Sequence, residues 1–149
     1  MKKIPNNIFF DEVTRLIEQG EAVTITVRGT SMTPFLRDGR DKVILTPFED
    51  ADLARGAVVL FRHKERHILH RIIRRRGNSL EIQGDALFTT ETATVTDVVA
   101  VVKEIVRPSG RVIRNGSVCW RYMWVISARR NGLRKLLHAL KHRMMNKKL

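Results

Sequence analysis

The chain has 149 residues, with 28 lysines and arginines against 15 aspartates and glutamates. This length suits one domain with its own core, and an apolar fraction of 43% excludes a wholly disordered chain. The single cysteine, Cys119, excludes an intrachain disulfide and a cysteine-rich metal site. We expect no metal and no cofactor.

The excess positive charge lies in the last third of the chain. Residues 107–149 contain twelve lysines and arginines and no acidic residue, which leaves residues 1–106 nearly neutral. A neutral body with a basic tail favours an anionic partner for the tail, either a membrane surface or a nucleic acid.

The N-terminus does not read as a targeting segment. Pro5, Asn6 and Asn7 follow Met1-Lys2-Lys3, where the apolar region of a secretory signal would begin. The sequence contains no apolar run of about 18 residues, the length that a transmembrane helix needs. These features predict a cytoplasmic location, with peripheral contact with an anionic membrane through the tail.

The first predicted element is a short helix over residues 7–19, because its apolar residues recur on one stripe. Alternating or continuous apolar runs then predict strands over 23–27, 42–45, 57–61, 67–73, 79–83 and 98–106, separated by polar turns and a loose loop over 89–96. The expected body, residues 1–114, is therefore one mainly-β domain of about six or seven strands with hairpin connections.

Residues 115–149 form the second predicted segment. Trp120, Tyr122 and Trp124 lie close together, and four leucines recur at helical spacing further on. This pattern predicts a basic amphipathic helix that binds the surface of anionic membranes and takes no part in the chemistry. An alternative is that residues 120–126 form a last strand on the body. Nucleic-acid binding is less favoured, since no nucleic-acid motif is recognisable.

Ser31 is the candidate nucleophile. It lies in Gly29-Thr30-Ser31-Met32-Thr33-Pro34, directly after a predicted strand. A serine on a tight turn after a strand presents its hydroxyl from a rigid scaffold, and N–H groups of the turn can face a developing oxyanion. The alternative, with about equal weight from the hexapeptide alone, is an ordinary strand-to-turn serine.

His70 and Asp85 are the candidate partners of Ser31. His70 shares a predicted strand face with Ile68 and Ile72, and such partial burial favours the neutral imidazole that a general base requires. Asp85 follows Gly84 at a strand end, from where its carboxylate could fix the tautomer of His70. The alternatives are a core histidine bonded to a backbone carbonyl and a plain Gly-Asp turn.

The order of these motifs resembles the signal peptidase family and the related SOS-repressor self-cleaving peptidases. The resemblance covers roughly residues 20–106 and implies a fold of coiled antiparallel sheets. It also implies that Ser31 is the nucleophile, that His70 is the base, as in the Ser-His branch, and that Asp85 orients His70. A further acidic residue often follows the Gly-Asp motif of this family, and Glu91 matches it loosely.

The leading hypothesis is a serine endopeptidase that cleaves a precursor or leader peptide with Ser31, His70 and Asp85. An alternative is a catalytically inactive β scaffold whose basic tail binds a membrane surface or nucleic acid. A third hypothesis is autoproteolysis, but the repressor branch pairs serine with lysine, so the histidine argues against it.

Overall fold

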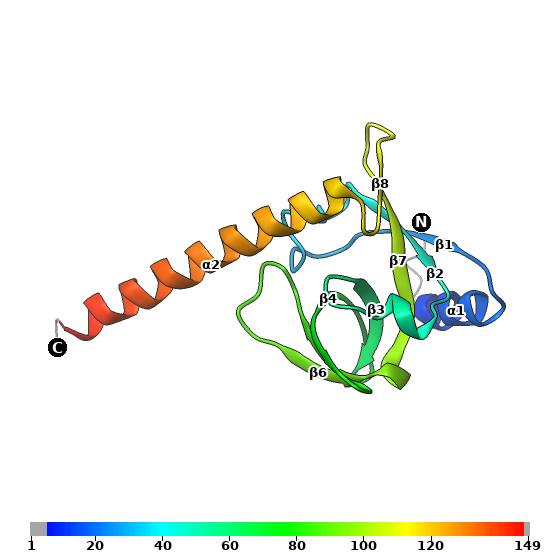
Figure 1. Ribbon diagram of the computed structural model, residues 1–149, viewed down its shortest axis with the longest axis horizontal. Helices are drawn as coiled ribbons and strands as arrows, with labels where there is room; N and C mark the ends of the chain where they lie inside the picture. Colours follow the sequence, from blue (N-terminus) through cyan, green and yellow to red (C-terminus); the bar gives the residue numbers. More distant parts are fainter. Residues whose placement is uncertain (1–5, 148–149) are drawn as a thin grey trace.

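The computed structural model describes residues 6–147, and its centre is a mainly antiparallel β-sheet between two helices (Figure 1). The elements in chain order are α1 (Asn6–Glu18), β1 (Val23–Thr26), β2 (Lys42–Thr46), β3 (Val58–His63), β4 (Arg66–Arg76), β5 (Ser79–Gln83), β6 (Glu91–Thr94), β7 (Val98–Val106), β8 (Val112–Arg114) and α2 (Val118–Asn146). Short 3₁₀ turns cover Asp50–Asp52 and Val95–Asp97.

All strand pairs are antiparallel, in the order β1-β2-β7-β3-β4-β5-β6, and β8 pairs with β7. The register shifts at three places, in the pairs β2–β7, β3–β7 and β4–β5. Such bulges bend strands and increase their twist. The predicted mainly-β class with a helix at each end is confirmed.

The core has two layers, one on each side of the central strand β3. Val58 and Leu60 pack into a cluster with α1, β1, β2 and β7, while Val59 and Phe61 pack into a second cluster with β4 and β5. A strand buried on both faces explains the continuous apolar run over 57–61 in the sequence.

Two strands were not predicted. The loop expected over 89–96 contains β6, which pairs with β5 along the sheet edge, and residues 112–114 form β8 beside β7. Both are short, and most of their side chains are partly or fully exposed. Because few side chains of these two strands are buried, their sequences do not show the alternation of apolar and polar residues that predicts a strand.

The C-terminal segment is one continuous helix, so the alternative strand over 120–126 is wrong. Ser117 caps its first turn by accepting a hydrogen bond from the Trp120 N–H. Trp120 is only 2% exposed and meets Phe35 edge to face. The predicted boundary at residue 114 thus separates segments that share one core.

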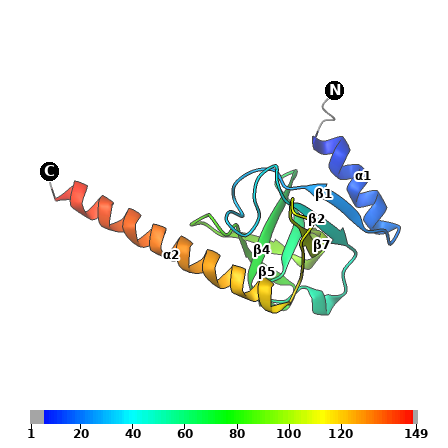
Figure 2. The same ribbon diagram turned by 90° about the horizontal axis from the view of Figure 1, so that it is seen from above.

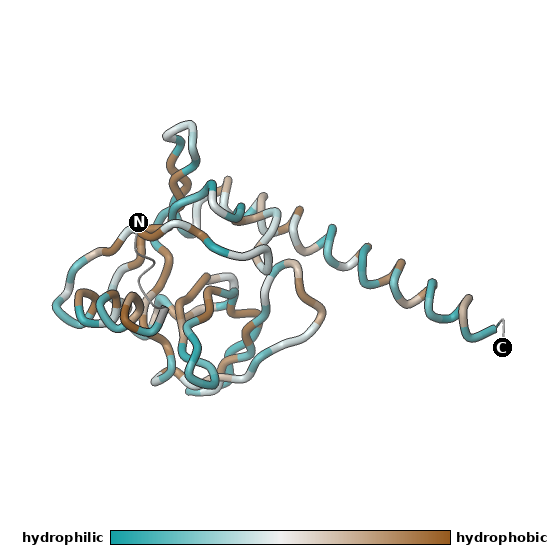
Figure 3. Tube along the Cα trace, turned by 180° about the vertical axis from the view of Figure 1, so that it is seen from behind, coloured by the Kyte–Doolittle hydropathy of each residue, from teal (hydrophilic) through white to brown (hydrophobic). Residues whose placement is uncertain are grey.

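Beyond this packed start, α2 runs away from the sheet, as two perpendicular views show (Figures 1 and 2). Apolar residues still recur along its outer part (Figure 3), and Leu133, Leu136, Leu137 and Leu140 are each about half exposed. Within residues 6–147, no helix is long and apolar enough to cross a membrane.

Candidate active site

Ser31 lies in a closed loop over residues 27–41. The Val27 N–H donates to Asp41 O at 2.9 Å, and the Gly39 N–H donates to Val27 O at 2.8 Å, so the two ends of the loop are joined. Gly29 has a φ of +90°, a conformation that other L-residues rarely adopt. The loop therefore presents Ser31 from a defined turn and not from a free segment.

Buried residues fix this loop from below. Met32, the residue after Ser31, and Phe35, three residues further on, are part of the core. The fully buried Asp41 carboxylate forms ion pairs with Arg37 and with Arg107 at the end of β7. Because a buried carboxylate is stable only when it is paired, these contacts hold the loop against the sheet.

His70 lies in the middle of β4, and its Nε2 is 3.0 Å from Ser31 Oγ. The Ser31 hydroxyl can donate this hydrogen bond when Nε2 is unprotonated. His70 is 4% exposed, and Ile68 and Ile72 both pack with the second core cluster, as predicted from their shared face. Burial lowers the pKa of His70 below its ordinary value, and the charge of Glu91 partly opposes that effect.

Glu91, the first residue of β6, is the third member of this contact chain. Its Oε2 lies 3.3 Å from His70 Nδ1, on the opposite side of the ring from Ser31. A carboxylate at Nδ1 favours the tautomer whose Nε2 is free to accept a proton. The sequence signal for Glu91 was only its position after Gly84-Asp85, in a segment that we expected to be a loop.

Asp85 lies just after β5, and its carboxylate binds Arg71 instead of the His70 ring. Its two carboxylate oxygens each accept a 2.8 Å hydrogen bond from Arg71, one from Nε and one from Nη2. This bidentate ion pair is almost fully buried. Asp85 is close enough for its charge to oppose the lowering of the His70 pKa, but the hydrogen bond to the ring comes from Glu91.

Arg71 connects the site to α2. Its Nη1 donates to Gly56 O at 2.7 Å, and its guanidinium lies over the rings of Phe35 and Trp124 at 4.2 and 5.1 Å from their centres. A guanidinium can stack on aromatic faces while its edge binds a carboxylate. Arg71 thus joins the Ser31 loop, the Asp85 loop and α2.

Gly84 allows the two loops and His70 to approach each other closely. A Cβ at this position would lie 2.8 Å from Ser31 O and 2.9 Å from His70 Nε2. The next residues fix the approach, since the Ala86 N–H donates to Ser31 O at 2.8 Å. A glycine is therefore required in the Gly-Asp motif, because any larger side chain would clash with the Ser31 turn and His70.

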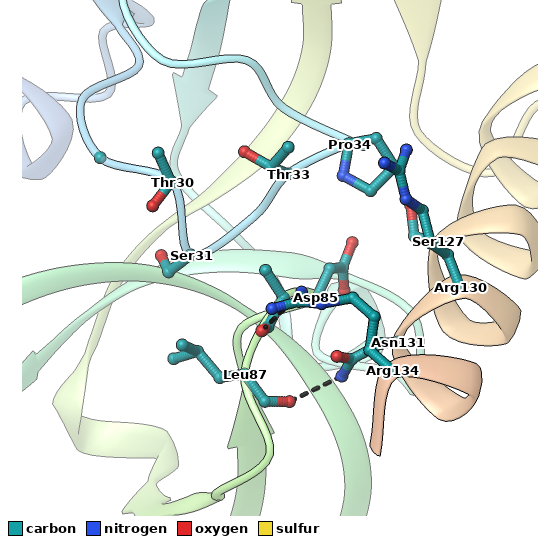
Figure 4. A pocket seen from close by; sticks show the side chains of 12 residues that line it. Thr30, Ser31, Thr33, Pro34, Asp85, Leu87, Ser127, Arg130, Asn131 and Arg134 are labelled. Atoms are coloured by element: carbon teal, nitrogen blue, oxygen red, sulfur yellow. Dashed lines mark hydrogen bonds between the residues drawn. The ribbon is translucent and has the colours of Figure 1, made fainter. Parts of the chain in front are cut away.

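A cleft of about 570 Å³ opens beside Ser31. The Ser31 turn forms one side, the 85–87 loop lies below, and α2 forms the other side (Figure 4). A smaller cleft of about 230 Å³, lined partly by residues 66–69 of β4, also reaches Ser31. The predicted tail lies beside the site, because Ser127, Arg130, Asn131 and Arg134 of α2 line the larger cleft. That the tail takes no part in the chemistry stays a prediction.

Within residues 6–147, no group of three or more histidine, cysteine or acidic side chains is arranged to hold a metal ion. A scan against models of known protein families and a search of curated proteins both return no match.

Proposed function

We propose that this protein is a serine endopeptidase in which Ser31 is the nucleophile, His70 the general base and Glu91 the residue that orients His70. The observation that carries the proposal is the unbroken contact chain from Ser31 Oγ to His70 Nε2 and from His70 Nδ1 to Glu91. A nucleophile, a base and an orienting carboxylate in this geometry form the catalytic triad of serine hydrolases.

The proposed reaction begins when Ser31 Oγ attacks the scissile carbonyl carbon while His70 Nε2 takes the hydroxyl proton. The resulting imidazolium is stabilised by the Glu91 carboxylate and then gives its proton to the departing amine, which leaves an acyl ester on Ser31. Water, deprotonated by His70, hydrolyses the ester and restores the hydroxyl. The Ser31 backbone N–H can serve as one oxyanion donor.

The two clefts that meet at Ser31 support an extended peptide as the substrate. A precursor or leader peptide fits this proposal, as does the resemblance to the Ser-His branch of the signal peptidases. The antiparallel sheet with its three register shifts is in line with that fold. In our proposal, Asp85 acts through Arg71 to hold the loop beside His70, and Glu91 has the role that the resemblance gave to Asp85.

The proposal is tested by treating the full-length protein with a fluorophosphonate and locating the adduct by mass spectrometry. We expect a single adduct on Ser31, and we expect its formation to slow by on the order of 10²-fold or more in His70→Ala, which lacks the base. Ser79→Ala, which removes an exposed serine of β5, is the matched control and should label like the natural protein. Labelling that is spread over several serines, or that is unchanged in His70→Ala, would contradict the proposal.

A further inference from the structure

The face of α2 that meets the body changes character along its length. Trp120 and Trp124 pack onto the core and onto Arg71, and one and two turns further the same face carries Ser127 and Asn131. The face becomes polar where it reaches the cleft beside Ser31. Packing alone does not require polar residues at these positions.

Hydrogen bonds fix the α2 side chains that form this wall of the cleft in position relative to Ser31. Asn131 Nδ2 donates to Leu87 O at 2.7 Å, as Figure 4 shows, and Arg134 donates to Ala86 O at 3.3 Å. The N–H of Ala86 in turn donates to Ser31 O at 2.8 Å. The α2 side chains are therefore fixed relative to Ser31 through one short loop.

Two polar atoms of this wall have no partner within residues 6–147. They are Ser127 Oγ and Asn131 Oδ1, which are both buried, and the whole Ser127 residue is only 1% exposed. Buried polar atoms nearly always have a hydrogen-bond partner. A hydroxyl and an amide oxygen are suited to bind the C=O and N–H groups of an extended peptide.

The charge of the cleft is positive. Arg130 and Arg134 extend from α2 into its lining, and neither forms an ion pair with another residue in the described range 6–147. The one carboxylate of the lining, Asp85, is already bound by Arg71. Arg134 uses Nη1 for its bond to Ala86 O and lies over the Phe88 ring, but neither guanidinium charge is paired with a carboxylate. Both groups can therefore bind a carboxylate from a ligand, as arginine commonly does.

We propose that this cleft is a subsite that selects an acidic peptide segment. Arg130 and Arg134 bind a glutamate or aspartate side chain of the ligand, and Ser127 and Asn131 bind its backbone. The inference rests on the proposed function, because it assigns a substrate class to the same site: a peptide with an acidic residue near the scissile bond.

Binding is measured separately from cleavage, with full-length Ser31→Ala and fluorescence anisotropy. The probes are three short alanine- and glycine-rich peptides that carry an uncharged dye and differ only in having glutamate, glutamine or lysine at two central positions. We expect the glutamate peptide to bind at least about tenfold more tightly than the glutamine peptide, and the lysine peptide to bind most weakly. Equal affinities for the glutamate and glutamine peptides would overturn the inference.

Matched double variants separate the subsite from the general positive charge of the helix. Added to Ser31→Ala, the pair Arg130→Gln and Arg134→Gln should remove the preference for glutamate. The pair Arg121→Gln and Arg129→Gln removes the same charge from exposed positions of α2 outside this cleft, and it should keep the preference. Equal loss in both pairs would mean that the cleft makes no specific contribution.

The outcome is distinguishable from failure of the peptidase proposal. If fluorophosphonate does not label Ser31 but the glutamate peptide binds through Arg130 and Arg134, the subsite stands and the chemistry does not. If Ser31 is labelled but the three peptides bind alike, the chemistry stands and the acidic specificity is wrong.

Discussion

The pKa of His70 is set by two opposing effects. Burial against the second core cluster disfavours the imidazolium and lowers the pKa, while the nearby carboxylates of Glu91 and Asp85 raise it, and burial is the larger effect. A general base must be neutral before it takes a proton, so a lowered pKa extends activity toward acid pH.

This balance predicts the pH dependence of activity. In the natural protein, the rate should rise with pH through an apparent pKa below the ordinary histidine value of about 6.5. Glu91→Gln removes a charge that raises the pKa, so the rise should move to lower pH. The plateau rate should also fall, by on the order of 10²–10⁴-fold, because the imidazolium loses its stabilising partner. The measurement is the pH profile of the rate at which fluorophosphonate labels Ser31.

Asp85→Asn is the contrasting variant, because its carboxylate binds Arg71. Breaking a buried ion pair costs about 3–5 kcal/mol, so this change should lower the free energy of unfolding far more than Glu91→Gln does. Urea denaturation of both variants tests this difference. A Glu91→Gln protein with an unshifted pH profile would return the orienting role to Asp85.

Gly84 gives a second prediction at the scale of single residues. Its alanine Cβ would meet a backbone oxygen and the reacting nitrogen of His70 at less than 3 Å, so Ser31 and His70 must move apart. We expect Gly84→Ala to reduce the rate of fluorophosphonate labelling of Ser31 by on the order of 10²-fold, as a misplacement of about 1 Å does. Gly132→Ala is the matched control, because a Cβ there meets nothing within 4 Å. Equal activity of the two variants would mean that the close approach is unimportant.

At the scale of elements, the sequence pattern predicted the strands that are strongly buried and missed the strands that are largely exposed. The strands around the core have continuous or alternating apolar runs, so their positions follow from sequence. The edge strand β6 has no such run, and Glu91, its functional residue, was left in a predicted loop. Arg71 was also missed as a connector, since no local pattern shows that an arginine within a strand will pair with a distant aspartate.

At the start of α2, composition suggested surroundings for the tryptophans that differ from those in the structure. Trp120 and Trp124 lie in a segment rich in basic residues, and that context suggested a membrane interface. The structure places Trp120 in the core and stacks Trp124 on Arg71. Composition describes a segment as a whole. The 3.6-residue period of a helix places the side chains of that segment on different faces, so the tryptophans and the basic residues can have different surroundings.

The packing of α2 makes a prediction about stability. Trp120→Ala should lower the free energy of unfolding by about 3–5 kcal/mol, the usual cost of removing a buried aromatic side chain. Tyr122→Ala, an equally drastic change at a position that is 66% exposed, should change it by no more than about 0.5 kcal/mol. Urea denaturation measures both. Equal small effects would place α2 outside the cooperative unit, as the predicted boundary at residue 114 implied.

At the scale of the whole molecule, α2 has two parts with different surroundings. Its first half belongs to the body and to the cleft. Its outer half contacts the body near its start, where Arg134 and His138 lie beside Phe88, and then extends away from the sheet (Figure 1). Lys135, Lys141 and Arg143 accompany the four half-exposed leucines there. A helix that exposes both apolar and basic residues suits the surface of an anionic membrane, where acyl chains and headgroups accept each kind.

We therefore predict that the outer half of α2 attaches the protein to anionic membranes. The full chain should co-sediment with vesicles of phosphatidylcholine that contain phosphatidylserine, and less with pure phosphatidylcholine. Added salt should weaken the attachment, because basic residues near the surface contribute about 1 kcal/mol each and this share is screened. Changing Leu133, Leu136, Leu137 and Leu140 to glutamine should abolish it, since helix propensity and charge are kept but the apolar contact is lost.

The matched control changes Val118 and Val125 to glutamine, which removes exposed apolar side chains from the packed half of the same helix. This control should sediment like the natural protein, and fluorophosphonate labelling of Ser31 should be unaffected in both sets, because the four leucines do not line the clefts at Ser31. If the leucine variants pellet as well as the natural chain, or if duplex DNA displaces the protein from the vesicles, the outer helix binds by charge alone. A nucleic acid would then be the better candidate for its partner.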